Sequence, residues 1–236
     1  MERHTGSLRI LISSGPTREA IDPVRFISNY STGYMGAQLA REALARGHQV
    51  TVVSGPAQEP LPSGASVVPV ESAQQMEQAL RRHAPGSDVV IMAAAVSDFR
   101  LRRRAGSKLP RRGRLTLALE ATPDLIGRLP RRPGQVRVGF AVESKPVLER
   151  AARKLRRKRL DLLVAQHLEE SGMPFGQRAV RAWLLAPHQR PASLGTRSKS
   201  RVARALLDKI EGLWYGQRRP TRSTGQRTRS ADVATT

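Results

Sequence analysis

Short apolar runs alternate with stretches of helical periodicity along most of the chain, and this alternation constrains the fold more than any other feature. Strands and helices that alternate at this spacing indicate parallel strands joined by crossover helices. The run Asp88–Ala95 (DVVIMAAA) is apolar almost throughout, which is typical of a central parallel strand covered on both faces. We therefore predict an α/β fold of three layers, Rossmann-like, around a mostly parallel sheet.

The element boundaries follow from this periodicity and from residues that start or stop helices. Strands are expected at residues 8–12, 49–53, 66–70, 88–95, 115–120, 135–141, 160–166 and 179–186. Helices are expected at residues 36–46, 72–84, 145–159 and 200–213, with Ser72 as the cap of the second. A further helix is expected to start at Thr122-Pro123-Asp124, with Thr122 as its cap and Pro123 in its first position.

The connection from Ser13 to Gly36 is about twenty residues long, far beyond the usual two to six for a loop between strand and helix. Asp22-Pro23 and Asn29 with Gly33 indicate fixed turns rather than disorder. The segment follows the first strand, at the edge where open α/β sheets bind ligands. A ligand-binding role is expected here, and an ordinary surface loop is the alternative.

A second irregular segment, Val96–Arg114, is long and basic and interrupts the alternation of strands and helices. We expect it to project over the sheet edge as a flap covering about residues 97–114. One domain is expected over residues 1–213. Residues 214–236 contain mostly Arg, Thr, Ser and Gly, with almost nothing to bury, and are predicted to form a disordered basic tail.

The charge balance is strongly basic, with 41 Lys and Arg residues against 19 Asp and Glu, a formal charge of +22. Such a chain associates nonspecifically with nucleic acid, and it also suits an enzyme with polyphosphate substrates. Aromatic residues make up 4%, too few for base-stacking platforms. Against this arginine-rich background the few lysines become informative: Lys108, Lys145, Lys154, Lys158, Lys199 and Lys209.

Several classes of protein are disfavoured by what the sequence lacks. Without cysteine there is no disulfide framework, thiolate catalysis or Cys-ligated metal. No apolar run approaches the ~20 residues that span a bilayer, and no secretory h-region follows Met1, so we expect a cytoplasmic protein that binds no membrane.

Familiar nucleotide and metal motifs are missing as well. The Gly-x-Gly-x-x-Gly fingerprint is absent, and the second strand ends in Val53-Ser54-Gly55 with no acidic residue for a ribose, which disfavours a nicotinamide-dependent reductase. No Gly-Lys-Ser/Thr phosphate loop occurs, and the five histidines are scattered. We assign no metal ligands among the residues.

Several blocks carry a family resemblance. In order, these are Ile10–Gly36 (ILISSGPTREAIDPVRFISNYSTGYMG), Ala93–Phe99 (AAAVSDF), the isolated Lys108, Thr122-Pro123-Asp124, Gly139-Phe140-Ala141 and Ala151–Ala165 (AARKLRRKRLDLLVA). Over about residues 8–212 the chain resembles phosphopantothenoylcysteine synthetase, the phosphopantothenate–cysteine ligase of coenzyme A synthesis.

The resemblance implies a ligase that joins 4′-phosphopantothenate to cysteine through an amide bond. Bacterial members use CTP and the eukaryotic type uses ATP. The substrate carboxylate attacks the α-phosphorus with assistance from Mg²⁺, pyrophosphate leaves, and the cysteine amine then displaces CMP from the acyl-cytidylate. Such chemistry needs cations and hydrogen-bond donors aimed at developing charge. The resemblance also implies a homodimer.

Many bacterial relatives carry a flavin-dependent decarboxylase domain ahead of the ligase. Here the first expected strand begins close to Met1, so we expect a separate phosphopantothenoylcysteine decarboxylase chain.

The resemblance also assigns roles to residues. Asn29 is expected to donate its amide to the acyl-nucleotide intermediate, and Lys108, in the flap, to neutralise phosphate or acyl charge. These two are the expected catalytic residues. Substrate contacts are expected from Arg25, Ser31, Gly33 and Ala94 besides Asn29. Nucleotide contacts are expected from Ala95, Asp98, Pro123, Asp124, Phe140, Lys154 and Lys158 besides Lys108.

Structural alternatives exist for several of these residues. Asn29 suits a left-handed turn, Asp124 suits a helix cap and Phe140 suits the core. Lys154 and Lys158 stand four apart on one helix face, which is also what a merely basic helix presents.

Two departures from the family pattern involve side chains of the expected site. Tyr34 stands where the family commonly has lysine (Ser-Ser-Gly-Lys-Met-Gly), and Gln166 stands where it commonly has asparagine. They motivate an alternative function, a catalytically lapsed member that binds nucleotides or nucleic acid.

Overall fold

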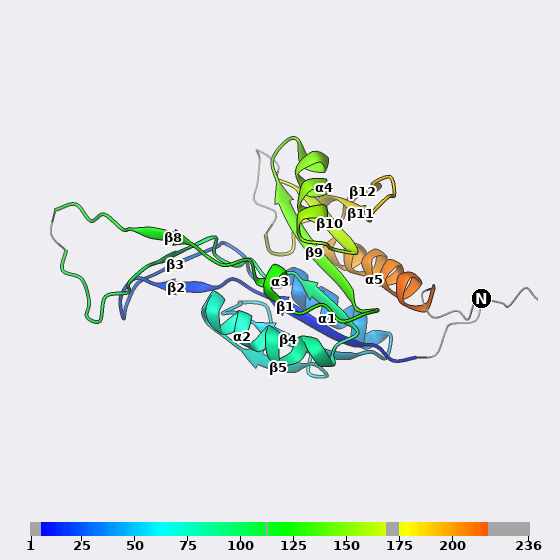
Figure 1. Ribbon diagram of the computed structural model, residues 1–236, viewed down its shortest axis with the longest axis horizontal. Helices are drawn as coiled ribbons and strands as arrows, with labels where there is room; N and C mark the ends of the chain where they lie inside the picture. Colours follow the sequence, from blue (N-terminus) through cyan, green and yellow to red (C-terminus); the bar gives the residue numbers. More distant parts are fainter. Residues whose placement is uncertain (1–5, 112, 169–174, 217–236) are drawn as a thin grey trace, which may run out of the picture.

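The computed structural model describes residues 6–111, 113–168 and 175–216, and its centre is an eight-stranded sheet. The strand order is β12-β11-β10-β9-β6-β1-β4-β5 (Figure 1). These strands are β1 (Arg9–Ser14), β4 (Gln49–Ser54), β5 (Ser66–Pro69), β6 (Val89–Met92), β9 (Val136–Glu143), β10 (Leu162–His167), β11 (Val180–Leu185) and β12 (Ala192–Arg197). The strands from β5 to β10 pair in parallel, whereas β11 and β12 run antiparallel. The predicted α/β fold with a mostly parallel sheet is confirmed.

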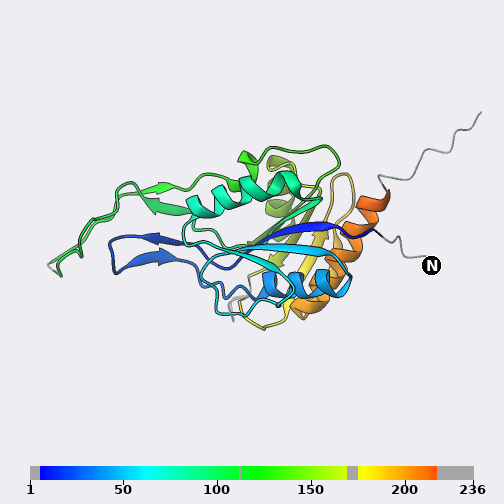
Figure 2. The same ribbon diagram turned by 90° about the horizontal axis from the view of Figure 1, so that it is seen from below.

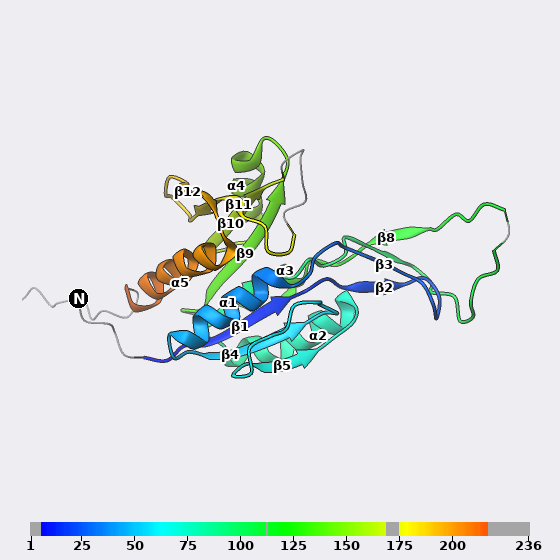
Figure 3. The same cartoon turned by 180° about the vertical axis from the view of Figure 1, so that it is seen from behind.

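Helices cover both faces of this sheet. They are α1 (Tyr34–Ala45), α2 (Ala73–His83), α3 (Leu125–Arg128), α4 (Val147–Arg157) and α5 (Lys199–Gly216), with a 3-10 turn at Ala84–Gly86. One core cluster packs α1 and α5 on one face, seen from behind in Figure 3. Two clusters pack α4 and α2, with residues of α3, on the other face. The protein is therefore the expected three-layer structure.

The N-terminal caps of α2 and α3 can be compared with the caps predicted from the sequence. Ser72 caps α2 as predicted, and Gln75 completes a capping box with it. The prediction for α3 was wrong, because its cap is Asp124, whose carboxylate accepts from Gly127 N, and not Thr122. The Thr122 hydroxyl is buried and has no hydrogen-bond partner in the described part of the chain. The Pro123 ring therefore precedes the helix instead of occupying its first position.

Two small hairpins extend the molecule beyond the sheet (Figure 2). The first, β2 (Arg18–Ala20) with β3 (Phe26–Ser28), lies inside the long connection after β1. The second pairs β7 (Phe99–Leu101) with β8 (Leu119–Ala121) and carries the expected flap. The predicted strand at 115–120 is thus mostly wrong: the segment from Leu115 is largely exposed, and only its end finds a partner strand.

Other differences concern element ends. The strand predicted at 88–95 ends at Met92, because the residues beyond it bond to the loop after β1, where Pro16 lacks an N–H for a regular ladder. The edge strand β12 was not predicted; it is largely exposed and contains Gly195 at φ 64, so it lacks an apolar pattern. The last helix continues to Gly216 instead of ending at 213, while the remainder of the predicted tail lies outside the described residues.

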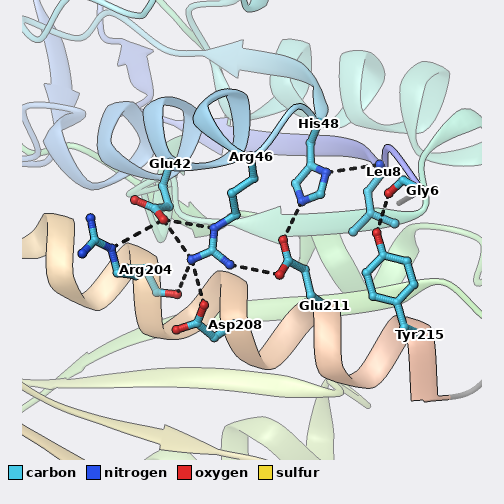
Figure 4. A network of polar contacts seen from close by, with 9 residues as sticks. All are labelled: Gly6, Leu8, Glu42, Arg46, His48, Arg204, Asp208, Glu211 and Tyr215. Atoms are coloured by element: carbon cyan, nitrogen blue, oxygen red, sulfur yellow. Dashed lines mark hydrogen bonds and ion pairs between the residues drawn. The ribbon is translucent and has the colours of Figure 1, made fainter. Parts of the chain in front are cut away.

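A polar network joins α1 to α5 at the end of the molecule away from the hairpins (Figure 4). Arg46, at the end of α1, forms ion pairs with Glu42, Asp208 and Glu211. Buried His48 accepts a hydrogen bond from Leu8 N through Nδ1 and contacts Glu211 through Nε2 at 3.0 Å.

Within residues 6–111, 113–168 and 175–216, no helix has both the length and the apolar character needed to cross a bilayer.

Candidate functional site

The strand order reverses between β1 and β6, so the chain leaves these neighbouring strands in opposite directions across the sheet. Open α/β sheets form a ligand-binding crevice at such a point, beyond the carboxyl ends of the strands. A cleft of about 990 Å³ lies at this edge. It is lined by the segments that follow β1 and β6, by residues of β9, β10 and α4, and by the starts of α1, α3 and α5.

The segment after β1 is held against the segment after β6 by hydrogen bonds. The Ala95 carbonyl accepts from Thr17 N at 3.3 Å and from Asn29 Nδ2 at 2.8 Å. Ser13 Oγ accepts from Ala94 N at 3.2 Å. These bonds place Asn29, the only asparagine in the chain, at the cleft wall with its amide fixed in orientation.

Two lysines from α4 enter the cleft from one side. Lys154 Nζ donates to the Phe140 carbonyl at 2.7 Å, and Lys158 Nζ pairs with Asp124 Oδ1 at 2.9 Å. Burial lowers the pKa of the Lys154 ammonium below its usual value, and the neighbouring Lys158 lowers it further, against weaker effects of nearby carboxylates. Two cations held close together in a partly desolvated cleft favour a polyanionic ligand.

Asp124 combines the two roles considered from sequence. It caps α3 and also anchors Lys158, while lying in the cleft wall. Phe140 likewise lines the cleft and packs against the core cluster under α1 and α5.

The cleft brings together most of the residues proposed from sequence. Its wall includes Asn29, Ser31, Ala94, Ala95, Asp98, Pro123, Asp124, Phe140, Lys154 and Lys158. Asp98 is exposed, and its charge opposes the lowering of the Lys154 pKa, so the two side chains lie within electrostatic range.

Three proposed residues lie outside this wall. Gly33 is buried behind it with φ 82, where a Cβ would come within 2.6 Å of the Ala57 Cβ. Arg25 pairs with the buried Asp22 and donates to the Leu109 carbonyl at 2.8 Å. Lys108, next to Leu109, is exposed on the flap. Arg25 therefore fixes the base of the flap, and Lys108 does not reach the cleft of its own chain in this conformation.

The cleft also includes a residue that the sequence analysis did not propose. Lys199 opens α5, is 4% exposed, and donates to the Gly176 carbonyl at 2.7 Å. The signal that could have revealed it is the one used for Lys108, a lysine kept in an arginine-rich chain. Gln166 and Tyr34, noted as departures from the family pattern, also line the cleft.

No group of three or more metal-ligating side chains occurs within the described ranges. The carboxylates of the cleft wall are Asp98 and Asp124. One or two carboxylates together with substrate phosphates are the usual ligands of Mg²⁺, so these residues fit an ion that arrives with a nucleotide.

Fold and cleft together define a doubly wound α/β protein with a cleft at the carboxyl edge of its sheet, and the lysines in the wall of this cleft suit a polyanionic ligand. Comparison with known proteins is more specific. Residues 6–213 match the family described as the DNA/pantothenate metabolism flavoprotein C-terminal domain. The chain belongs to this family.

The most similar curated relatives include two kinds of protein. The chain is 38% identical over 211 residues to the coenzyme A biosynthesis bifunctional protein CoaBC of Vibrio vulnificus (strain YJ016), covering 86% of this chain and 52% of the relative. It is 36% identical over 213 residues to a cysteine/cysteine sulfinic acid decarboxylase of an unknown prokaryotic organism, covering 89% and 59%. The chain thus spans between half and three fifths of these relatives.

Solved structures support the same family. The C-terminal domain of a coenzyme A biosynthesis bifunctional protein CoaBC aligns with a TM-score of 0.75 and 35% identity, covering 89% of this chain and 96% of that one. A Cab2 mutant in complex with phosphopantothenate-cysteine aligns with a TM-score of 0.73 over 89% and 88% of the chains. Its 18% identity to this chain supports a shared fold only.

Proposed function

We propose that the protein is a phosphopantothenate–cysteine ligase that uses a nucleoside triphosphate, most simply CTP. The family, with relatives named for coenzyme A biosynthesis, supports this substrate class. The observation that carries the proposal is the cleft, whose wall contains both the fixed amide of Asn29 and the ammonium groups of Lys154, on α4, and Lys158, at its C-terminus.

In this proposal the triphosphate lies beside α4, where Lys154 and Lys158 balance its charge. The carboxylate of 4′-phosphopantothenate attacks the α-phosphorus and pyrophosphate leaves. Asn29 orients the acyl group, because its amide is already held by the Ala95 carbonyl. Preorganised donors of this kind stabilise charge that develops in the transition state without reorganisation. Cysteine then attacks the acyl carbon through its amine, which loses a proton, and CMP leaves.

Mg²⁺, when bound, supplies charge neutralisation at the phosphoryl oxygens. Asp98 and Asp124 are the residues of this chain that would hold it, and Asp124 also keeps the Lys158 ammonium in place.

A homodimer forms part of the proposal. Lys108 lies on the exposed flap, away from the cleft of its own chain, and exposed apolar side chains gather on the two hairpins and the flap. They include Val24, Phe26, Tyr30, Phe99, Leu115 and Leu119. Exposed apolar patches of this kind mark interaction sites, and we propose that a second copy of the chain covers this one.

The test is an assay of the purified protein with CTP, Mg²⁺, 4′-phosphopantothenate and cysteine, following release of pyrophosphate. We expect release that depends on phosphopantothenate, and CTP and ATP compared in parallel give the nucleotide preference. Release of carbon dioxide from cysteine is measured in the same mixtures, because one relative is named a cysteine decarboxylase. No release with either nucleotide, together with salt-sensitive binding of nucleic acid, would favour a lapsed enzyme.

A further inference from the structure

The antiparallel edge of the sheet carries positive charge without compensating acids. Residues 175–207 contain β11, β12 and the start of α5, and they include six arginines and one lysine but no aspartate or glutamate. Elsewhere several arginines pair with nearby carboxylates, as Arg153 does with Glu149 and Arg100 does with Glu120. Paired charges largely cancel each other's field, whereas charges of one sign add.

Four of these arginines gather where the cleft opens and are called the rim arginines below: Arg178, Arg181, Arg197 and Arg201. All four are exposed, and none forms an ion pair with any carboxylate in the described part of the chain. The pairing of β11 with β12 sets Val180 opposite Arg197, so the start of one strand lies beside the end of the other. Because β11 runs antiparallel to β10, this place is next to the carboxyl end of β10, at the cleft (Figure 1).

The rim arginines stand close to the cleft wall without belonging to it. Three of them are two residues away from a wall residue, Gly176 or Lys199. Two trans peptide links span at most about 7.6 Å between Cα atoms. The fourth, Arg181, precedes Ala182, which pairs with Gln166 of the wall. Since the Debye length is about 8 Å at physiological ionic strength, these charges act on an anion at the entrance of the cleft.

The opposite side of the cleft is cationic as well. Lys154 and Lys158 belong to its wall, and so does the exposed Arg157 of α4. The carboxylates of the wall are Asp98 and Asp124, and the second is already paired with Lys158. A cleft bordered by one sign of charge focuses the field at its entrance, which raises the local concentration of an oppositely charged ligand and speeds its association.

We infer that the rim arginines capture polyanionic substrates from solution and steer them into the cleft, the nucleoside triphosphate most strongly because it carries the most charge. This role deepens the proposed function, on which it rests, and assigns residues that act before binding is complete. A guanidinium stays charged throughout the accessible pH range, so the attraction does not depend on protonation. The rim arginines set the rate of association, whereas the wall residues hold the bound ligand.

A nucleic acid is the other polyanion that such a surface attracts. Binding of single strands depends on aromatic rings on which bases stack. The aromatic side chains of residues 175–207 are Phe175, which lines the cleft, and Trp183, whose ring has the Arg181 guanidinium 5.3 Å from its centre. Within this range the rim thus offers no open stacking surface, and it borders a cleft of about 990 Å³, a size typical of small-molecule sites. Both observations favour a small polyanion.

The first experiment measures association directly. CTP with a fluorescent label on its ribose is mixed with the protein in a stopped-flow instrument at low ionic strength. In the double variant Arg178→Gln with Arg197→Gln, we expect the association rate constant to fall by roughly threefold to tenfold, while the dissociation rate constant changes by less than about twofold. In about 1 M salt, where the Debye length is about 3 Å, the variant and the wild type should associate at equal rates.

A matched control removes the same amount of charge elsewhere. Arg82, near the end of α2, and Arg190, after the end of β11, are exposed, lie outside the cleft wall and have no carboxylate partner among the described residues. The double variant Arg82→Gln with Arg190→Gln should change the association rate constant by less than about twofold. Equal losses in the two double variants would overturn the inference, because net charge alone would then explain them. An unchanged rate constant in the rim variant would overturn it as well.

Two further variants separate charge from folding. Arg178→Lys with Arg197→Lys keeps both charges and should restore the wild-type association rate constant, which a purely structural role of the guanidinium groups would not allow. If Arg178→Gln with Arg197→Gln fails to fold, Arg181→Gln with Arg201→Gln removes the other half of the rim and should slow association in the same way. A loss that lysine fails to restore in a folded protein would contradict steering.

Comparison of ligands distinguishes this role from the proposed function and from nucleic-acid binding. Labelled CMP, with fewer charges, should lose less association rate than labelled CTP in the rim variant, and equal losses would refute the inference. A wild-type protein that captures labelled CTP in this way but releases no pyrophosphate contradicts the ligase and keeps the inference. Pyrophosphate release, together with association that the rim variant leaves unchanged, contradicts the inference alone. A rim variant that loses affinity for a short single-stranded RNA but captures CTP at the wild-type rate would show that the surface binds nucleic acid instead.

Discussion

Individual side chains in the cleft are held by neighbours that are themselves part of the wall. Asn29 is fixed by the Ala95 carbonyl, Lys154 by the Phe140 carbonyl and Lys158 by Asp124. Each polar group is thus positioned before a ligand arrives, which lowers the entropy lost on binding. The consequence is that conservative changes at these residues should affect rate more than folding.

The variant Asn29→Asp tests whether a conservative change in the cleft affects the rate more than folding. The change removes the donor to the Ala95 carbonyl and places a carboxylate near the attacking substrate carboxylate. We expect kcat to fall by roughly a hundredfold to a thousandfold, the range for losing a preorganised donor. Steady-state kinetics measure the loss, and circular dichroism checks the fold. Gln49→Glu, which changes an exposed amide to a carboxylate at the start of β4 and outside the cleft, is the control. A kcat near the wild-type value in Asn29→Asp would refute the catalytic role.

The lowered pKa of Lys154 predicts how the affinity for the nucleotide depends on pH. Its pKa lies below the ordinary lysine value because of burial and Lys158, while Glu143, Asp98 and Asp124 oppose the shift. Raising the pH through this lowered pKa removes the charge, so the Kd for CTP should increase at alkaline pH, where the nucleotide phosphates are already fully ionised.

Calorimetry of CTP binding between neutral and alkaline pH measures this dependence. Lys154→Arg keeps its charge throughout and should flatten the curve. If wild type and Lys154→Arg show the same pH dependence, Lys154 does not contribute its charge to the nucleotide.

The sequence indicated the edge of the sheet at which a ligand would bind, and the family resemblance supplied the individual residues. Asn29, Asp98 and Lys154 were proposed in this way, and the structure places them in the wall of one cleft. Lys199 could not be placed in this way, because only the antiparallel strands β11 and β12 return the chain to the start of α1. Long-range packing, which local patterns do not encode, brings it there.

At the scale of elements, the base of the flap is held by a small group of polar contacts around Asp22, Arg25 and Leu109, called the clip below. The buried Asp22 carboxylate accepts from Val24 N and Arg25 N at 2.8 Å and from Leu109 N at 3.1 Å. The Arg25 guanidinium bridges the same carboxylate to the Leu109 carbonyl. These bonds hold the pKa of Asp22 well below its usual value, so the clip is complete at neutral pH and is lost only as pH falls through that lowered pKa.

Asp22→Asn should therefore loosen the flap selectively. An amide places a donor where the Leu109 N–H and the guanidinium need an acceptor. We expect trypsin to cut the flap faster at its exposed residues Arg102 and Arg103, with little change in Tm of the body. Mass spectrometry identifies the cut, and Glu71→Gln on the surface is the control. Equal cleavage rates in the two variants would contradict the clip.

The other end of the molecule depends on the contact of α1 with α5 in Figure 4. His48 Nδ1 accepts from Leu8 N, so we assign the ring hydrogen to Nε2, which donates to Glu211. Glu211 also pairs with Arg46 at 3.1 Å. One carboxylate thus satisfies a buried imidazole and a guanidinium from two different elements.

Glu211→Ala should destabilise the protein through both contacts. Leaving His48 and part of Arg46 unpaired should cost about 1–3 kcal/mol in the free energy of unfolding, which urea denaturation measures. The exposed pair of Glu149 with Arg153 gives the control, since Glu149→Ala should change stability by less than about 0.5 kcal/mol. An equal loss of unfolding free energy in both variants would show that the network stabilises the protein no more than an exposed ion pair does.

The difference between buried and exposed elements also explains which parts of the fold could be predicted from the sequence. Strands and helices of the sheet layers were predictable because burial on one or both faces imposes a period. The hairpins β2–β3 and β7–β8 were not, because each of their strands is only 3 residues long and buries little, which is too short for a recognisable period. The cap of α3 was missed because Asp124 and Thr122 are both good caps, and only the path of the chain decides between them.

At the scale of the whole molecule, the hairpins and the flap extend far from the body and carry exposed apolar groups (Figure 2). If a second copy covers them, light scattering should give twice the 26.0 kDa chain mass. Val24→Glu combined with Leu115→Glu puts charges into this surface and should give a monomer. Val67→Glu, at an exposed apolar position on β5 outside the hairpins, should stay dimeric. A monomeric wild type would contradict the homodimer.

The two ends of the described chain meet far from the cleft. The Tyr215 hydroxyl donates to the Gly6 carbonyl, beside the start of β1, whereas the cleft lies past the end of that strand. An attachment made directly at these two ends of the described chain, whether an affinity tag, a sensor surface or a fused enzyme, would leave the ligand entrance unobstructed. A circularly permuted chain, joined here and reopened elsewhere, would also preserve it.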